Sequence, residues 1–239
     1  MKKLCSILSV VLCAILTVSC SKENKPTGKE NGYDYVDLGL SVKWATCNIG
    51  ADSPEDYGDY FAWGETAPYY ISLNPISWPK DKSKGYDWSS YKYCSNGSSV
   101  ITKYCTNGFY GTVDNKSALD LSDDAANANW GGNWRLPTRA EQDELRNDCT
   151  WEWTSLNGVY GFKVTSKKAG YTNRSIFLPA AGCRFYDGSV GVGSTGNYWS
   201  SSLYANFSSY AYNLYFNSEI FDWYNECRYK GQSVRAVCK

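Results

Sequence analysis

Hydrophobic and polar residues alternate along several short stretches of the chain, a pattern typical of β-strands with one buried face. Loops rich in Gly, Ser and Asn separate these stretches from one another. The alternating stretches comprise residues 35–46, 59–65, 149–154, 160–166, 175–182, 198–202, 211–216 and 233–237. The pattern predicts many short strands with mainly antiparallel pairing.

The clearest helix signal lies at residues 130–145. Thr138 and Glu141 have the spacing of a capping box, in which the hydroxyl and the carboxylate each accept a backbone N–H. Pro137 prevents the helix from starting earlier. A helix is therefore expected from about Arg139 to Asn147, after an extended Trp-Arg-Leu-Pro segment.

A second, shorter helix is expected at residues 121–130, with Ser122 as its cap. Residues 66–110 and 187–229 are interpreted as largely loop regions. The predicted fold class is therefore α+β, with mainly antiparallel short strands, two or three short helices and long loops.

The N-terminus has the pattern of an export signal. A basic start precedes an apolar stretch at residues 4–18, which is too short for a confident membrane span, and a polar segment follows Cys20. A small residue before a cysteine, followed by a polar tether, resembles the bacterial lipoprotein processing site. Residues 1–19 are therefore predicted to be a lipoprotein signal peptide, with Cys20 as the lipidated first residue of the mature chain. An ordinary cleaved signal and an uncleaved anchor are the alternatives.

The rest of the chain divides into a tether and a single domain. Residues 20–32 are short, charged and contain Pro and Gly, so they are predicted to be flexible. Residues 33–239 are predicted to form one domain. Acylation of Cys20 would hold this domain at the outer membrane without a membrane span, and exposure at the cell surface is one expected orientation.

The amino-acid composition excludes sites that depend on histidine and argues against nucleic-acid binding. The chain of 239 residues contains no histidine, which excludes Ser-His-Asp triads, Cys-His dyads and His-ligated zinc. Loss of Lys2 and Lys3 with the leader leaves 22 of the 24 basic residues against 24 acidic ones. A net charge of −2 is a poor match for nucleic acid, and no nucleic-acid partner is expected.

Seven of the ten cysteines remain in the predicted domain once the leader and Cys20 are set aside. Disulfides are plausible in an exported chain, and an odd number leaves at least one free thiol. Cys94 with Cys105 is the nearest pair in sequence, and Cys183 with Cys227 is a second candidate. Alternatively, several cysteines are small buried hydrophobic residues.

A family pattern runs in order along the predicted domain, and the chain resembles the Fibrobacter succinogenes major paralogous domain, a family common in lipoproteins of gut Bacteroidota. The residues that carry the resemblance are 37–48, 58–65, 123–126, 134–138, 177–182, 198–202 and 233–237.

The Arg-Leu-Pro-Thr-x-x-Glu core at residues 135–141 is also similar to a corner in formylglycine-generating enzymes and other C-type-lectin-like folds. This resemblance implies a C-type-lectin-like domain in which the N- and C-terminal strands pair and a long loop region carries the variable surface.

No motif for catalysis, metal or cofactor binding is found. The cysteines in the C-terminal half are too widely spaced for the copper centre of formylglycine-generating enzymes, and the calcium-site motifs of C-type lectins are absent. Asp123 and Asp124 are more simply explained by the first turn of a helix. Asp143 and Glu144 are carboxylates of the kind that glycoside hydrolysis uses, but no sequence rule places them at the required separation.

Three aromatic residues in the C-terminal half are candidate ligand contacts, because exposed aromatic faces bind sugars and protein partners. Trp223 and Tyr224 are flanked by polar residues, whereas Trp199 fits core packing better. The predicted function is a membrane-anchored, non-catalytic binding or adhesion module for glycans or proteins. The alternatives are a structural subunit of a surface assembly and, least favoured, an enzyme of unrecognised type.

Overall fold

The computed structural model describes residues 25–69, 85–95, 97 and 100–239. The predicted signal peptide, residues 1–19, and the predicted lipidation site Cys20 lie outside these described residues. Within them, no helix is both long and apolar enough to cross a membrane.

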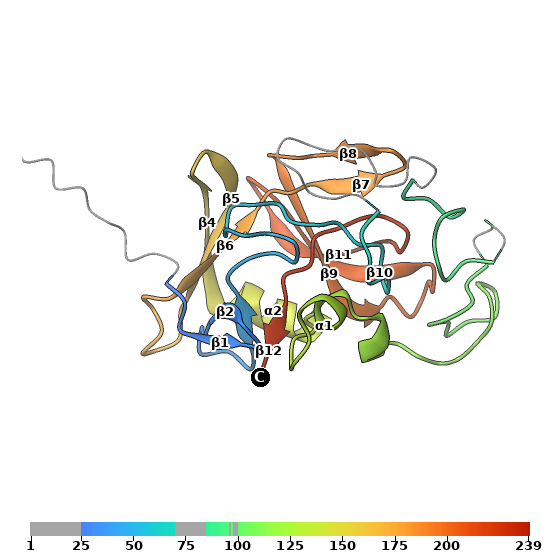
Figure 1. Cartoon of the computed structure of the whole chain (residues 1–239), viewed down its shortest axis with the longest axis horizontal. Coiled ribbons are helices and arrows are strands. Elements are labelled where there is room, and N and C mark those ends of the chain that lie inside the picture. The colour runs from blue at the N-terminus through green and yellow to red at the C-terminus, as the bar shows by residue number, and fades with distance from the viewer. Residues whose placement is uncertain (1–24, 70–84, 96, 98–99) are drawn as a thin grey trace, which may run out of the picture.

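Antiparallel β-sheet dominates the described chain (Figure 1). The sheet orders are β1-β2-β3-β12, β11-β10-β9, β4-β5-β6 and β7-β8. The strands are β1 (Gly28–Glu30), β2 (Tyr33–Val36), β3 (Lys43–Ala45), β4 (Cys149–Leu156), β5 (Val159–Ser166), β6 (Ser175–Pro179), β7 (Cys183–Phe185), β8 (Gly188–Val190), β9 (Thr195–Leu203), β10 (Tyr210–Asn217), β11 (Phe221–Cys227) and β12 (Val237–Cys238).

The predicted α+β, C-type-lectin-like class is wrong, because the fold is essentially all-β. Strand accounts for 38% of the described residues and helix for only 10%. The described residues contain two α-helices, α1 (Ala125–Trp130) and α2 (Arg139–Asp148), and one 3-10 turn, η1 (Leu121–Asp123). The sequence signals for these helices are strong but local, and both helices are short. Within residues 187–229, the predicted strands at 198–202 and 211–216 are present as β9 and β10, whereas β8 and β11 occupy stretches that were interpreted as loop.

The described N-terminal segment is held in the fold by pairing. β1 and β2 form a hairpin whose turn, Asn31 and Gly32, has positive φ at both residues, the geometry that Asn-Gly favours. The predicted flexible tether, residues 20–32, is therefore wrong at Gly28–Glu30, which are a strand. At the other end of the chain, β12 pairs with β3.

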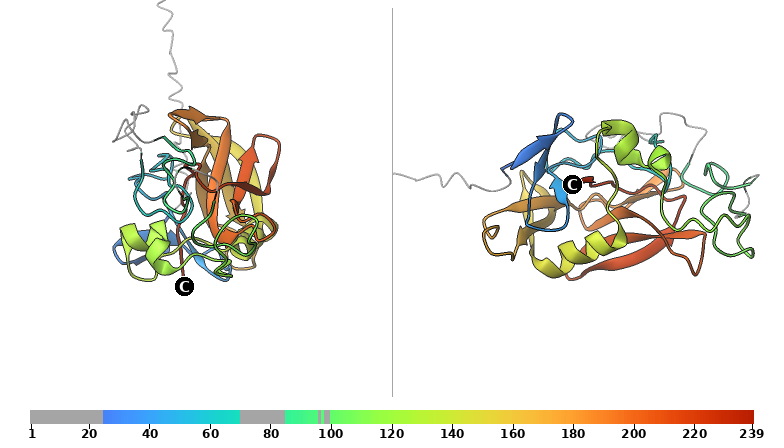
Figure 2. Two further views of the ribbon diagram at one scale, coloured as in Figure 1. Left: turned by 90° about the vertical axis from the view of Figure 1, so that its right-hand side faces the viewer. Right: turned by 90° about the horizontal axis from the view of Figure 1, so that it is seen from below.

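The corner at residues 135–148 fastens α2 to the sheet β11-β10-β9. Thr138 Oγ1 accepts the N–H of Glu141, and the Glu141 carboxylate accepts the N–H of Thr138, so the capping box is present. Gln142 Nε2 donates to the carbonyl oxygens of Tyr198 and Trp199 at 3.1 and 3.2 Å. The corner thus positions this sheet, and Figure 2 shows α2 lying along the sheet when the molecule is viewed from below.

The first helix begins later than predicted. Ser122 lies within η1, and Asp124, not Ser122, caps α1 by accepting the N–H groups of Ala126 and Asn127. The other carboxylate oxygen of Asp124 accepts the N–H of Leu136 at 2.8 Å. Asp124 therefore joins the short helix to the segment that leads into α2.

Two hydrophobic clusters lie against the sheet β11-β10-β9. On one face of the sheet, Tyr198, Leu214 and Phe216 pack in a cluster with residues of α2 and of the sheet β4-β5-β6. On the opposite face, Trp199 and Ala211 join a second, aromatic-rich cluster beneath the loops. The rest of this second face is not covered by either cluster.

Candidate functional site

The partly uncovered face of the sheet β11-β10-β9 carries two rows of side chains, because residues opposite each other on antiparallel strands share a face. In the first row, Asn197, Tyr215 and Asp222 lie opposite one another on β9, β10 and β11. The second row is formed by Trp199, Asn213 and Tyr224. Polar and aromatic side chains from three strands therefore meet on one surface.

This surface contains an open pocket of about 790 Å³. Tyr224 is 61% exposed, and its ring centroid lies 6.1 Å from that of Tyr215, with 47° between the ring planes. The pocket is lined by Asn197, Asn213, Tyr215, Ile220, Asp222, Trp223, Tyr224, Asn225 and Glu226. Aromatic rings beside a few convergent polar groups are the usual lining of a small-ligand site.

Two amides of the pocket lining, Asn213 and Asn197, are buried. Asn213 is only 1% exposed, and its Oδ1 has no hydrogen-bond partner. Asn197 is also buried, and its Nδ2 makes a long contact of 3.4 Å with Thr195 Oγ1. Amides offer both donors and acceptors, so these two side chains can bind a ligand hydroxyl group either as its donor or as its acceptor.

The two carboxylates of the pocket already have cationic partners. Asp222 pairs with Arg146 of α2, and Glu226 pairs with Lys230, whose Nζ lies 2.7 Å from Glu226 Oε2. The described residues that line the pocket include no Lys or Arg. The site is therefore polar but has no unbalanced positive charge.

The ring of Trp223 lies on the opposite face of the sheet from Tyr224, because Trp223 pairs with Leu214 and side chains alternate along a strand. The guanidinium of Arg139 lies 4.1 Å from the centroid of its ring, and Tyr212 contacts it edge-on at 5.5 Å. This cation–π contact and the neighbouring ring hold the indole against the first turn of α2. Of the predicted ligand contacts, Trp223 and Tyr224 are both among the lining residues, but only Tyr224 lies in a row on the pocket face, whereas the Trp223 ring packs against α2.

Trp199, the third predicted ligand contact, belongs to the core. It is 1% exposed, and its Nε1 donates to the carbonyl oxygen of Phe61 at 2.8 Å. The prediction that it contacts ligand is wrong because the aromatic cluster covers its ring. It lies opposite Asn213 in the same row but is not among the residues that line the pocket.

The predicted disulfides Cys94–Cys105 and Cys183–Cys227 are not formed, since all four cysteines are free. Cys94 lies opposite Ile101 in a short bridge, and Cys105 Sγ donates to the carbonyl oxygen of Asn107 at 3.2 Å. Burial raises the pKa of Cys94, Cys183 and Cys227. These three thiols are protonated at neutral pH and therefore weak nucleophiles.

The acidic residues considered for metal or hydrolytic chemistry have structural partners. Among the described residues, no group of three or more His, Cys, Asp or Glu side chains is placed to hold a metal ion. Asp123 accepts from Tyr104 Oη at 2.6 Å and pairs with Lys92 and Lys103. Asp143 lies beside two arginines of its own helix, and Glu144 accepts the backbone N–H of Ser41 at 3.0 Å.

The Asp123 cluster predicts a pH-dependent contribution to stability. Burial alone would raise the pKa of Asp123, but hydrogen bonds from Lys103 and Tyr104 hold it well below its ordinary value of 3.8. A carboxyl whose pKa is lower in the folded state stabilises the fold above its unfolded pKa and loses this effect as the pH falls. Asp123→Asn is expected to cost about 1–3 kcal/mol at pH 7 and clearly less at pH 3. Urea unfolding at both pH values measures this, and an equal cost at both would contradict it.

Asn213 and Tyr215 were missed by sequence reasoning, although β10 was expected. Asn213 interrupts the apolar residues of a strand that is otherwise Tyr-Ala-Tyr and Leu-Tyr-Phe. A lone amide at a position that alternation assigns to a buried face is a usable signal, because burying a polar group is unfavourable without a partner.

Comparison with known families adds one match. A family model described as a domain of unknown function (DUF8237) matches residues 162–237. The matched stretch contains β9, β10 and β11, and therefore every residue of the pocket lining. No curated protein and no solved structure is significantly similar to the chain. The resemblance to the Fibrobacter succinogenes major paralogous domain stays a prediction.

Proposed function

We propose that this protein is a non-catalytic binding module for glycans. The observation that carries the proposal is the open pocket on the sheet β11-β10-β9, where the exposed Tyr224 lies above buried amides. A sugar ring can stack its C–H face on a tyrosine while its hydroxyls bond to amides and carboxylates. The pocket combines both kinds of group within two adjacent rows.

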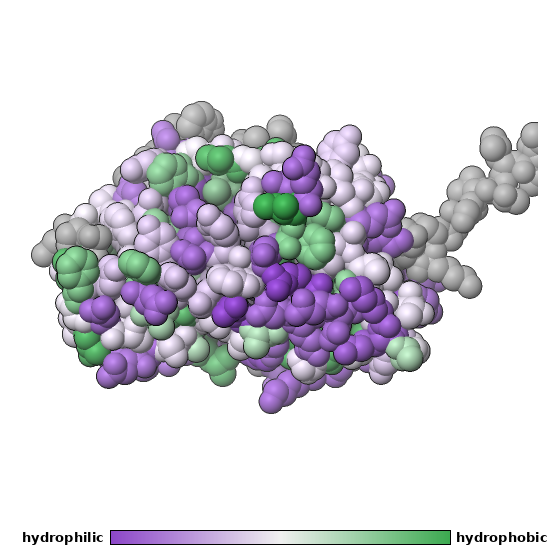
Figure 3. Space-filling model, turned by 180° about the vertical axis from the view of Figure 1, so that it is seen from behind, coloured by the Kyte–Doolittle hydropathy of each residue, from purple (hydrophilic) through white to green (hydrophobic). Residues whose placement is uncertain are grey.

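The alternative is an interaction subunit of a surface assembly. Figure 3 shows the side of the molecule opposite to that in Figure 1, where small hydrophobic areas are separated by hydrophilic ones. Permanent subunit interfaces are more hydrophobic than the mixed surface on this face. The pattern on this face therefore supports a reversible polar ligand over a permanent subunit contact.

The proposal includes attachment to the outer membrane through an acylated Cys20. The support is the order of basic start, apolar stretch, small residue, cysteine and polar tether. Intact mass of the protein extracted from membranes tests this step. A mass that includes diacylglyceryl and acyl groups is expected, and a mature chain without them would refute the anchor.

A glycan array tests the binding function. The protein is incubated on an array of bacterial, dietary and host glycans, and hits are titrated in solution by calorimetry. We expect saturable binding to a subset of glycans. Absence of binding to every glycan on the array would overturn the glycan-binding function. Measurable turnover of any bound glycan would instead support the enzyme alternative.

A further inference from the structure

We infer that the pocket selects neutral glycans over acidic ones, and that Asn213 is the residue that recognises a ligand hydroxyl. This inference rests on the proposed function and specifies its ligand class. It follows from two independent features of the pocket, the unpartnered amide of Asn213 and the charge arrangement at the wall.

The side-chain amide of Asn213 has a buried acceptor for which the protein supplies no donor. It is 1% exposed, and its Oδ1 accepts no hydrogen bond, although it lies in the middle strand of the sheet, beside the register shift between Ala211 and Asn213. A buried acceptor without a donor is unfavourable, and such groups in native structures call for an explanation. Because Asn213 also lines the pocket, a ligand hydroxyl can supply the missing donor.

The charges of the wall disfavour an anionic ligand. Asp222 and Glu226 are the charged groups among the described lining residues, and both are acidic. Because each acid already has a cationic partner, the wall offers an incoming carboxylate or sulfate no free cation to replace the hydration that the anion would lose. Arg146 and Lys230 already pair with these acids, so a cationic ligand would have to displace an existing partner. A neutral polyhydroxyl ligand meets neither obstacle.

Asn213→Leu separates a ligand-binding role from a structural one. Leucine has a similar size and removes the unpartnered amide. Glycan affinity should fall at least about tenfold because the ligand hydroxyl loses its acceptor. The urea midpoint of the ligand-free protein should stay the same or rise. If affinity is unchanged, or if the variant is destabilised, Asn213 is not the recognition residue.

Gln232→Leu is the matched control. Gln232 is also fully buried, and both its amide atoms lack partners, but it does not line the pocket. This variant should shift the urea midpoint in the same direction and leave glycan affinity unchanged. An equal loss of affinity in both variants would mean that the effect of Asn213→Leu is not specific to the pocket.

The choice of ligand is tested with the wild-type protein on a matched array. Neutral glycans are compared with sialylated, uronic-acid-containing and sulfated glycans, and with chitosan oligomers as cationic probes. We expect binding to neutral glycans and at least about tenfold weaker binding to the acidic ones. Equal or stronger binding of acidic or cationic glycans would overturn the inference while the glycan-binding function stands. No binding to any glycan would overturn both.

Discussion

Arg228→Met is expected to destabilise the protein by at least about 3 kcal/mol. Arg228 is fully buried and follows directly on β11. Its guanidinium donates to the carbonyl oxygens of Lys103, Tyr104 and Ser208 at 2.9–3.1 Å. Methionine keeps much of the volume but donates nothing, so three buried carbonyl oxygens lose a donor.

The same substitution also tests how the residue after β11 is held to the loop at residues 103–104. The Arg228 guanidinium lies 4.7 Å from the ring centroid of Trp63 and joins the end of β11 to residues 103–104. Urea unfolding measures the loss. Lys116→Met, which removes an exposed ion pair with Asp120, is the control and should cost less than about 1 kcal/mol. A loss as small as this for Arg228→Met would show that the buried network contributes little.

Tyr224→Ala is expected to lower glycan affinity at least about tenfold without changing the fold. Tyr224 is exposed on the edge strand β11, so its removal opens no cavity in the core. The substitution removes the most accessible ring of the pocket, on which a sugar ring would stack. Calorimetric titration with a glycan that binds the wild type measures the loss.

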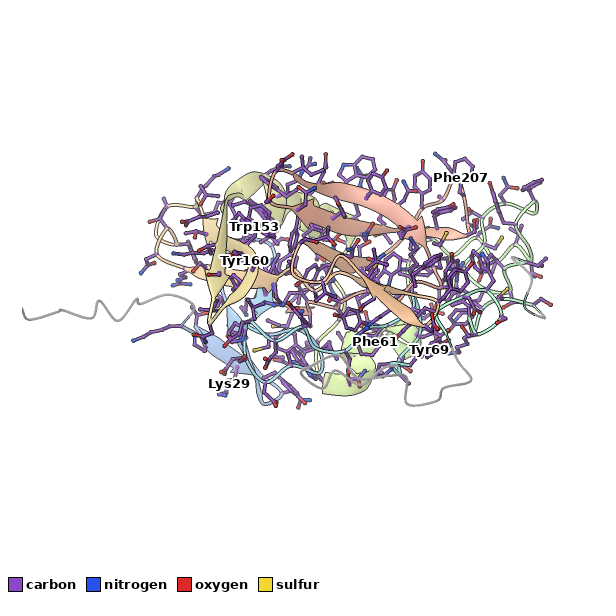
Figure 4. All side chains as sticks on the ribbon, turned by 90° about the horizontal axis from the view of Figure 1, so that it is seen from above. Lys29, Phe61, Tyr69, Trp153, Tyr160 and Phe207 are labelled. Atoms are coloured by element: carbon purple, nitrogen blue, oxygen red, sulfur yellow. The ribbon has the colours of Figure 1, made fainter. Side chains whose placement is uncertain are left out.

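Tyr160→Ala is the matched control for Tyr224→Ala. Tyr160 is 54% exposed, also lies on a strand, and stacks on Trp153 in the sheet β4-β5-β6. Figure 4 shows Tyr160 and Trp153 together on the β4–β5 hairpin, away from Phe207 near the opposite end of the molecule. Affinity should be unchanged in this variant. If both tyrosine variants bind as the wild type does, the pocket is not the glycan site.

Local signals at the corner were strong enough to be read from the sequence. Thr138, Glu141 and Pro137 specify one cap through contacts within a few residues, and α2 begins at Arg139 as expected. Because these signals act only over a few residues, they also led to the wrong fold class. A cap fixes where a helix starts but does not determine its share of the fold, which depends on strand pairings between distant residues.

β11 shows why the remaining strands were harder to predict. Its sequence, Phe-Asp-Trp-Tyr-Asn-Glu-Cys, alternates only weakly, because β11 is an edge strand and is half-exposed on both faces. The polar neighbours of Tyr224 did indicate an accessible ring, whereas the Trp223 ring packs against Arg139. Asn213 required knowledge of the strand register, because only pairing with Tyr224 places it in the pocket.

Cysteine spacing was a poor guide for a related reason. The separation between Cys94 and Cys105 allows a bridge but does not orient either side chain. In the folded chain, the pairing of Cys94 with Ile101 and the contact of Cys105 with Asn107 give each cysteine its own partner.

NMR mapping tests most directly whether the pocket on β9, β10 and β11 is the binding site. The ¹⁵N-labelled protein is titrated with the neutral glycan that gives the strongest array signal, and backbone and side-chain amide shifts are followed. The largest changes are expected at Asn213, including its side-chain amide, and at Asn197, Tyr215 and Tyr224. Changes concentrated on the sheet β4-β5-β6, with the Asn213 amide unmoved at saturation, would contradict the account.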